Sequence, residues 1–183
     1  MQRAIAVAAY DDIPADFRGT PVERLVAWHN GFSNEPETAV LHAEMLVGMC
    51  MDNRKKLRIP ENFAFILRAG GGNLRPSEFK VSFAVAVGGV RCIAIIVHNH
   101  CGMVGLSGRR EQFVDGLVDA GWEREPAEQH FDSYAPLFEI GNEIDFVLAE
   151  AKRLRARYPK VLVAPLFYNV DDNRLYCLNE QIA

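Results

Sequence analysis

Residues 92–101 read CIAIIVHNHC, six apolar residues followed by a short cluster of two histidines and a cysteine. The apolar part contains three isoleucines and a valine, and it does not alternate with polar residues as a strand with one solvent-exposed face would. Residues 45–50 and 63–67 are two more apolar runs of strand length. Continuous apolar strands are typical of a parallel sheet that helices cover on both faces. The sequence therefore predicts a parallel sheet with helices between its strands.

Four segments around these runs carry the signals of helices. Thr20-Pro21-Val22-Glu23 fits a capping box with proline at the first helical position, and the helix that it opens is expected to end near Gly31. Pro76–Val87 has apolar residues at helical spacing. The other two predicted helices run from Ser107 to about Gly121 and from about Glu143 to Tyr158.

The C-terminal part completes the predicted sheet. Val161–Phe167 predicts a fourth parallel strand, and after turn residues at 171–173, Leu175–Leu178 is expected to return as an antiparallel edge strand. We expect an α/β fold with a mostly parallel four-stranded central sheet flanked by helices and a C-terminal antiparallel edge strand. Residues 1–183 are expected to form a single domain, with an N-terminal helical arm (1–40) and an α/β core (41–183).

Composition narrows the possible partners. The chain of 183 residues has a net charge of −4, which does not fit a nucleic-acid-binding protein. No apolar run approaches the roughly 20 residues of a membrane-spanning helix, and the early stretch Ala4–Ala9 is too short for a signal-peptide core. We therefore expect a cytoplasmic protein without nucleic-acid or membrane partners, whose four cysteines are thiols and not disulfides.

Two of these thiols stand where predicted strands end. Cys50 closes the first apolar run, and Cys101 follows the third within His98-Asn99-His100-Cys101. Ligand sites of open α/β sheets gather at the carboxyl ends of strands, so the two segments are expected to converge. Zinc accepts thiolate and imidazole readily, and three protein ligands leave a fourth position for catalysis. The residues therefore predict a catalytic Zn²⁺ site, while Cys92 and Cys177 are expected to be buried apolar residues.

The residues after Cys50 make this pattern specific. Cys50-Met51-Asp52-Asn53-Arg54 followed by His98-Asn99-His100-Cys101-Gly102 has the form C-x-D-x-R and then H-x-x-C-G. From about Met45 to Met103 the chain resembles the β-class carbonic anhydrases. The resemblance implies a zinc lyase that reversibly hydrates carbon dioxide to bicarbonate by means of a zinc-bound hydroxide. It also implies a sheet that extends across a homodimer or a dimer-based oligomer.

The same resemblance implies a role for each residue. Cys50, His98 and Cys101 are the implied zinc ligands, Asp52 the acceptor of a hydrogen bond from the zinc-bound water or hydroxide, and Arg54 the residue that orients Asp52. Two thiolates cancel the formal charge of zinc and so acidify water less than three neutral histidines would, which makes a carboxylate that fixes the hydroxide useful. Without Arg54, Asp52 can become a fourth ligand and close the site. We expect that Asp52 does not coordinate zinc at alkaline pH.

The chain departs from the family pattern near these residues. The segment between Arg54 and Arg68 is several residues shorter than usual, and Asn99-His100 stands where a threonine-aspartate pair is common. His100 is therefore either an ordinary loop histidine or a proton relay. Gly70–Asn73 is compatible with a phosphate cradle or, as we expect, with a close backbone approach near the site.

Three other functions remain open from the sequence. Cys50, Asp52, His98 and Cys101 can form a closed zinc site that only stabilises the fold. A hydroxide at the same site can attack carbon disulfide or carbonyl sulfide, which would make the protein a hydrolase of the same family. A zinc-binding protein without catalysis, such as a sensor or an assembly subunit, fits the shortened segment after Arg54.

Overall fold

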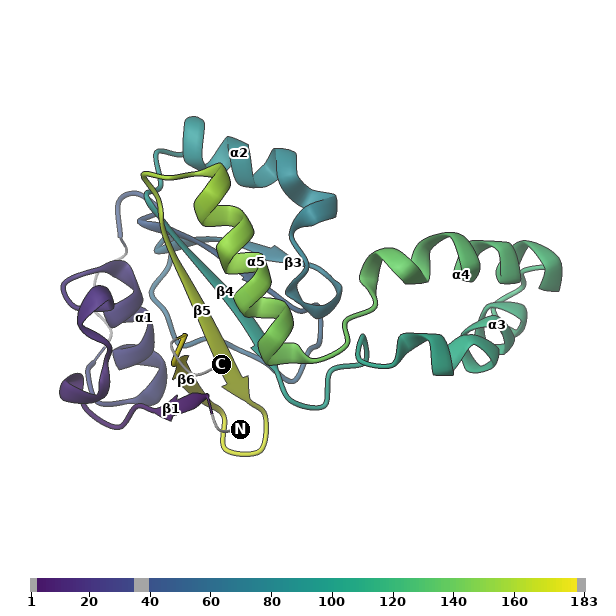
Figure 1. Ribbon diagram of the computed structural model, residues 1–183, viewed down its shortest axis with the longest axis horizontal. Coiled ribbons are helices and arrows are strands. Elements are labelled where there is room, and N and C mark those ends of the chain that lie inside the picture. The colour runs from purple at the N-terminus through teal and green to yellow at the C-terminus, as the bar shows by residue number, and fades with distance from the viewer. Residues whose placement is uncertain (1–2, 35–39, 181–183) are drawn as a thin grey trace.

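The computed structural model describes residues 3–34 and 40–180. A six-stranded sheet in the order β1-β6-β5-β4-β2-β3 forms its centre (Figure 1). The strands are β1 (Ala4–Ala6), β2 (Met45–Met49), β3 (Ala64–Arg68), β4 (Cys92–His98), β5 (Leu162–Asn169) and β6 (Arg174–Leu178). The α-helices are α1 (Pro21–Asn30), α2 (Glu78–Ala86), α3 (Arg110–Asp119), α4 (Arg124–Phe138) and α5 (Glu143–Arg157).

The parallel part of the sheet confirms the predicted fold class. Strand β4 pairs in parallel with β2 on one side and with β5 on the other, and β2 pairs in parallel with β3. All seven residues of β4 and all five of β2 are buried, which explains why neither run alternates with polar residues. Because these strands are parallel, their carboxyl ends, including His98 at the end of β4, meet at one edge of the sheet.

The side of the sheet beyond β5 contains one strand more than expected. Strand β6 pairs antiparallel with β5 through residues such as Cys177, which lies opposite Leu166, as the sequence predicted. Strand β1 then pairs antiparallel with the outer side of β6. The sequence did not predict β1, because a run of three residues is too short to show a periodicity.

Helices cover both faces of the sheet and divide the core into two layers (Figure 1). Ala94 and Ile96 of β4 pack in the layer that contains α1, whereas Ile93, Ile95 and Val97 pack in the layer that contains α2 and α5. Each fully buried aliphatic side chain contributes roughly 1.5–3 kcal/mol. The side chains of β4 therefore alternate between the two layers and pack against helices on both faces. This packing fixes the position of the strand.

Helix α1 has the bounds that its sequence signals predicted. The Thr20 side chain accepts a hydrogen bond from the Val22 backbone N–H (3.2 Å), and Glu23 accepts one from the Gly19 N–H (2.9 Å). At the other end Gly31 adopts a left-handed conformation with φ of 79°. Of the predicted N-terminal arm, residues 1–2 and 35–39 lie outside the described part of the chain.

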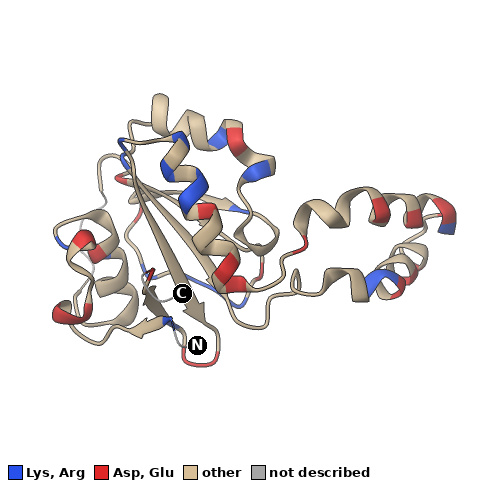
Figure 2. Cartoon of the chain, in the orientation of Figure 1, with Lys and Arg blue, Asp and Glu red and all other residues tan. Residues whose placement is uncertain are grey.

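Helices α3 and α4 form a hairpin that projects from the body of the molecule (Figure 1). Ion pairs join the two helices, among them Arg110 with Asp132 (2.8 Å) and Arg124 with Asp115 (2.5 Å). Figure 2 shows charges of both signs on the outer half of the hairpin. None of the described helices is long and apolar enough to cross a membrane.

Candidate metal centre

Cys50, His98 and Cys101 converge at the carboxyl edge of the sheet. Cys50 follows β2, His98 is the last residue of β4, and Cys101 lies three residues further along the chain. Their possible ligand atoms all lie within 4.8 Å of one another, and all three residues are buried. Within residues 3–34 and 40–180 this is the only group of three or more His, Cys, Asp or Glu side chains with this geometry. The three residues can hold a metal ion.

The His98 ring is oriented as a metal-binding imidazole would be. Its Nδ1 lies 2.7 Å from the carbonyl oxygen of Asn99, so a proton on Nδ1 donates to that oxygen. Its Nε2 is buried and has no hydrogen-bond partner in the described part of the chain. With the proton on Nδ1, the Nε2 lone pair is unused, and a buried unpaired polar atom is costly. A cation bound by Nε2 would satisfy it.

A hydrogen bond links the thiol groups of Cys50 and Cys101. A hydrogen bond from the Cys101 thiol lowers the pKa of Cys50 most, and the His98 ring and the backbone N–H groups of Asp52 and Gly71 lower it further. The same bond, together with burial, raises the pKa of Cys101. The two sulfurs therefore lie close enough for one cation to bind both.

A run of three glycines allows the backbone to approach the thiols. Gly71 and Gly72 have positive φ angles of 62° and 74°. A Cβ atom on Gly72 would lie only 3.3 Å from the carbonyl oxygen of Ile96. The glycines thus provide a close backbone approach, as expected from the sequence, and the Gly71 N–H donates to the Cys50 sulfur.

Arg54 holds the Asp52 carboxylate. The Arg54 Nη2 donates to Asp52 Oδ2 (2.6 Å), Nε lies 3.0 Å from Oδ1, and the Arg54 backbone N–H donates to Oδ1 (2.9 Å). These bonds, with that of the guanidinium foremost, hold the pKa of Asp52 well below its usual range. Arg54 also donates to the carbonyl oxygen of His100 (3.0 Å). Asp52 is therefore ionised and turned toward Arg54, and it does not belong to the group of three ligand atoms.

Two residues beside the site were missed by the sequence analysis as functional candidates. Arg68 donates to the carbonyl oxygens of Cys50 (3.2 Å), Asp52 (3.4 Å) and Lys55 (3.1 Å), so it fixes the loop that carries Cys50 and Asp52. Lys55 is only 1% exposed. The position of Arg68 at the end of a predicted strand was a usable signal. Lys55 gave none, because lysines in polar loops are ordinarily exposed.

His100 lies on the surface beside the metal group and is not part of it. Its side chain is 64% exposed, and its Nε2 lies 3.5 Å from an oxygen of Asp171. Asn99 donates to the same oxygen (2.8 Å) and accepts a hydrogen bond from the Val170 N–H (2.8 Å). The loop after β4 is thus tied to the turn between β5 and β6.

An apolar cavity of about 260 Å³ is lined by residues that neighbour the metal group in sequence, although none of the three possible ligands lines it. Met51, Gly70 and Met103 line it close to the cysteines, and Met103 packs in the same apolar cluster as Cys50 and Cys101. Side chains of the α3–α4 hairpin form its other wall, namely Phe113, His130, Phe131, Tyr134, Ala135 and Phe138. A neutral, apolar molecule can therefore be accommodated between Met51, Met103 and the hairpin.

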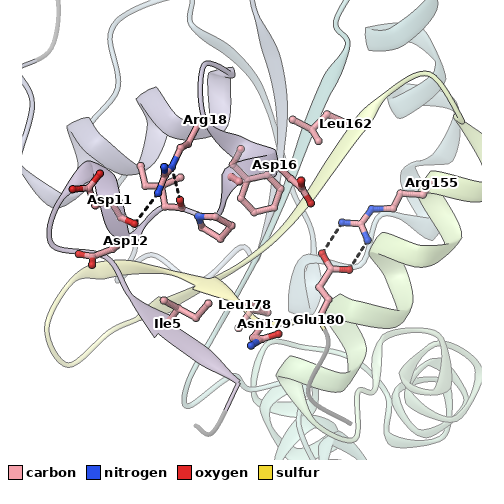
Figure 3. Close-up of a pocket in the computed structure, with 14 residues that line it drawn as sticks. Ile5, Asp11, Asp12, Asp16, Arg18, Arg155, Leu162, Leu178, Asn179 and Glu180 are labelled. Atoms are coloured by element: carbon pink, nitrogen blue, oxygen red, sulfur yellow. Dashed lines mark hydrogen bonds and ion pairs between the residues drawn. The ribbon is translucent and has the colours of Figure 1, made fainter.

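A larger cavity of about 660 Å³ lies elsewhere, between the N-terminal turns, β6 and α5 (Figure 3). The two guanidinium groups that line it, those of Arg18 and Arg155, already have hydrogen-bond or ion-pair partners. Arg155 pairs with Glu180 (2.5 Å), and Arg18 donates to the carbonyl oxygens of Ile13 (3.0 Å) and Asp11 (2.9 Å). None of the predicted site residues lines this cavity.

Other cysteine and histidine residues do not belong to the metal group. Cys92 and Cys177 are buried thiols, and burial raises the pKa of each to about 12. His29 is buried beside Tyr168, and burial lowers its pKa to about 4. All four cysteines are free.

Comparison with known proteins finds similarity in structure. No protein-family model matches the chain, and no curated protein matches its sequence. A carbonic anhydrase from Glaciozyma antarctica matches with a TM-score of 0.63 and 21% identity, over 91% of this chain and 100% of that one. A β-carbonic anhydrase isoform from Trichomonas vaginalis matches with a TM-score of 0.63 and 16% identity, over 79% and 88%. An apo carbon disulfide hydrolase matches with a TM-score of 0.55 and 21% identity, over 77% and 80%. The chain has a β-carbonic anhydrase-like fold, as the motifs predicted.

Proposed function

We propose that this chain is a zinc enzyme that reversibly hydrates carbon dioxide to bicarbonate. The observation that carries the proposal is the buried group of Cys50, His98 and Cys101, in which His98 Nε2 has no partner in the described part of the chain. The group lies in a fold similar to that of solved β-carbonic anhydrases. Two sulfurs and one nitrogen suit zinc better than the oxygen-seeking cations.

Three protein ligands would leave one coordination position for a small molecule. Zinc held by the three ligands would act as a Lewis acid and lower the pKa of a water molecule in the open position. In the hydration step the water oxygen forms a bond to the carbon of carbon dioxide, one proton leaves, and bicarbonate results. The apolar cavity bordered by Met51 and Met103 supports this substrate, because carbon dioxide is neutral and carries no net dipole.

Asp52 and Arg54 would position the attacking water. Because Arg54 keeps Asp52 ionised, the carboxylate can only accept a hydrogen bond, and it would take one from the water and fix the direction of the oxygen lone pair. Arg54 in turn is tied to the carbonyl oxygen of His100, so the carboxylate has a fixed location. This arrangement supports the open form of the site, in which Asp52 is not a metal ligand.

His100 would carry the released proton to solvent. It is exposed, stands one residue before Cys101, and its Nε2 lies 3.5 Å from the Asp171 carboxylate. We expect His100→Ala to lower the hydration rate in weakly buffered solution, and imidazole added as buffer to restore it. An Asp171→Asn variant should show a smaller loss. A rate of His100→Ala equal to wild type at every buffer concentration would exclude the relay.

Stopped-flow measurement of carbon dioxide hydration tests the proposed function. Zinc-loaded protein is compared from pH 6.5 to 9 with metal-free protein and with Asp52→Asn. We expect activity that rises with pH, needs zinc and is lost in the variant. Hydration at the uncatalysed rate at every pH would reject the proposal.

Hydrolysis of carbon disulfide or carbonyl sulfide is the second candidate function. The similarity to a carbon disulfide hydrolase and the apolar lining of the cavity favour it. Sulfide release from carbon disulfide, measured beside carbon dioxide hydration on the same zinc-loaded sample, separates the two. The reaction with the larger kcat/KM identifies the substrate.

An apolar surface on β3 and α2 supports a homodimer. Strand β3 is at the edge of the sheet, and Phe65 is 38% exposed, Phe79 81% and Phe83 50%. A groove of about 240 Å³ runs between these rings. We expect light scattering to give the mass of a dimer or of a dimer-based oligomer, and the double variant Phe79→Glu, Phe83→Glu to give a monomer. A wild-type monomer at micromolar concentration would contradict this assembly.

The cytoplasm is the proposed compartment. Four buried free thiols, two of them in the metal group, are compatible with a reducing environment.

A further inference from the structure

Lys55 is buried in a way that lysines rarely are. Its side chain is 1% exposed, whereas its neighbour Lys56 lies on the surface. The Lys55 Nζ is fully covered and has no hydrogen-bond partner in the part of the chain that the structure describes. A buried ammonium group without a partner is costly, and lysine is almost never fully buried unless it is paired. The side chain therefore needs a partner that the described residues do not provide.

The position of Lys55 links it to the metal group. Arg68 donates to the carbonyl oxygen of Lys55 (3.1 Å) and to that of Cys50 (3.2 Å), so one guanidinium fixes both residues in the same loop. Burial lowers the pKa of the Lys55 amine, while Cys50, Asp52 and Cys101 raise it. Lys55 in turn lowers the pKa of Asp52. The amine and the metal group are therefore within electrostatic reach of each other.

The charges of the site leave Lys55 without a counter-charge once a metal is bound. Two thiolates cancel a divalent cation, and Asp52 is paired with Arg54. Arg68, the other nearby cation, uses its guanidinium on backbone carbonyl groups. The Lys55 ammonium then remains as an uncompensated buried positive charge. A small anion is the partner that would compensate it.

We propose that Lys55 is an anion-binding residue of this site and that its ammonium group holds bicarbonate. The identity of the anion rests on the proposed function. Hydration converts neutral carbon dioxide into an anion. A fixed positive charge therefore stabilises bicarbonate and the negative charge of the transition state more than it stabilises carbon dioxide. Lys55 would thereby act on the reacting atoms from the loop that also carries Asp52.

The test compares Lys55→Met, Lys55→Gln and the surface control Lys56→Met with wild type. Isothermal calorimetry measures the binding of sodium bicarbonate to zinc-loaded protein at one fixed pH, with sodium chloride keeping the ionic strength constant. We expect bicarbonate affinity to fall on the order of ten- to a hundredfold in Lys55→Met, as is usual when a hydrogen bond to a charged group is lost. Lys55→Gln should lose less affinity, and Lys56→Met should bind as wild type does.

The melting temperature of the zinc-loaded protein without bicarbonate is a second readout, independent of activity. Methionine keeps the apolar stem of lysine and removes the unpaired charge, so Lys55→Met should melt at the same temperature as wild type or a few degrees higher. A large decrease in both Lys55 variants would show that the amine has a structural partner, and it would overturn the proposal.

The outcomes separate this proposal from the proposed function. If wild type hydrates carbon dioxide and Lys55→Met binds bicarbonate as tightly as wild type, the role of Lys55 is rejected while the enzyme function stands. If wild type shows no hydration but binds bicarbonate in a manner that depends on Lys55, the anion site stands and the enzyme function is rejected. Absence of bicarbonate binding to wild type overturns the anion site.

Discussion

Replacing Cys101 by serine should lower the zinc affinity of the protein by on the order of 10²- to 10³-fold and abolish carbon dioxide hydration. Structural zinc in small proteins is held with about 10–16 kcal/mol, so one of a few ligands accounts for roughly 3–4 kcal/mol. A serine hydroxyl stays protonated and cannot replace a thiolate.

Zinc content after dialysis against a competing chelator measures this effect. Cys92→Ala is the matched control, because Cys92 is a buried thiol at the start of β4, the strand that ends in His98. The control should retain one zinc per chain. Equal zinc retention by Cys101→Ser and Cys92→Ala would show that Cys101 is not a ligand.

Replacing Asp52 by asparagine should lower kcat/KM for hydration by about 10²–10⁴-fold, the usual contribution of a positioned acid–base group, while zinc remains bound. The amide presents an N–H donor beside Arg54, where the carboxylate accepted several hydrogen bonds, so both the charge and the geometry change. Because Arg54 keeps the pKa of Asp52 far below neutrality, the loss should be similar across the whole range from pH 6.5 to 9.

Stopped-flow kinetics and zinc analysis of the same samples measure this effect. Asp119→Asn, an exposed aspartate of α3, serves as the control for the removal of one negative charge. A zinc-loaded Asp52→Asn variant as fast as this control would remove Asp52 from the mechanism. Loss of zinc from Asp52→Asn would indicate that Asp52 is a fourth ligand in the closed site.

The central strands of the sheet could be predicted from sequence because they are buried on both faces. The runs that became β2, β4 and β5 are apolar throughout, and their parallel pairing follows from that burial. Helix α1 was predicted from Thr20 and Gly31, which form its caps in the structure. In these places local chemistry and tertiary packing favour the same conformation.

Helix α4 was missed because its sequence signals are weak. Pro126 lies in its first turn, where a missing N–H is tolerated, and Pro136 lies in its last turn. Only Ala127, Phe131 and Ala135 are buried along its length, so the apolar stripe is narrow. The hairpin with α3 also contains ion pairs such as Arg110–Asp132, which a single sequence does not reveal.

The residues of the candidate site could be predicted from the sequence, but the contacts that hold them in place could not. The spacing of Cys50, His98 and Cys101 was enough to expect their convergence, because strand order brings both loops to one edge. The burial of Lys55 and the bonds of Arg68 depend on the path of the loop between Arg54 and β3. That loop is shorter than the family pattern, so no motif described it.

X-ray absorption at the zinc edge tests the central claim most directly, namely that Cys50, His98 and Cys101 bind a zinc ion with one open position. At pH 8 or above, zinc-loaded wild type should show two sulfur atoms at about 2.3 Å and two lighter atoms at about 2.0–2.1 Å. One of the lighter atoms should be an imidazole nitrogen, and the other should exchange when a small anion such as azide is added. A zinc shell without sulfur, or one that azide leaves unchanged, would contradict the account.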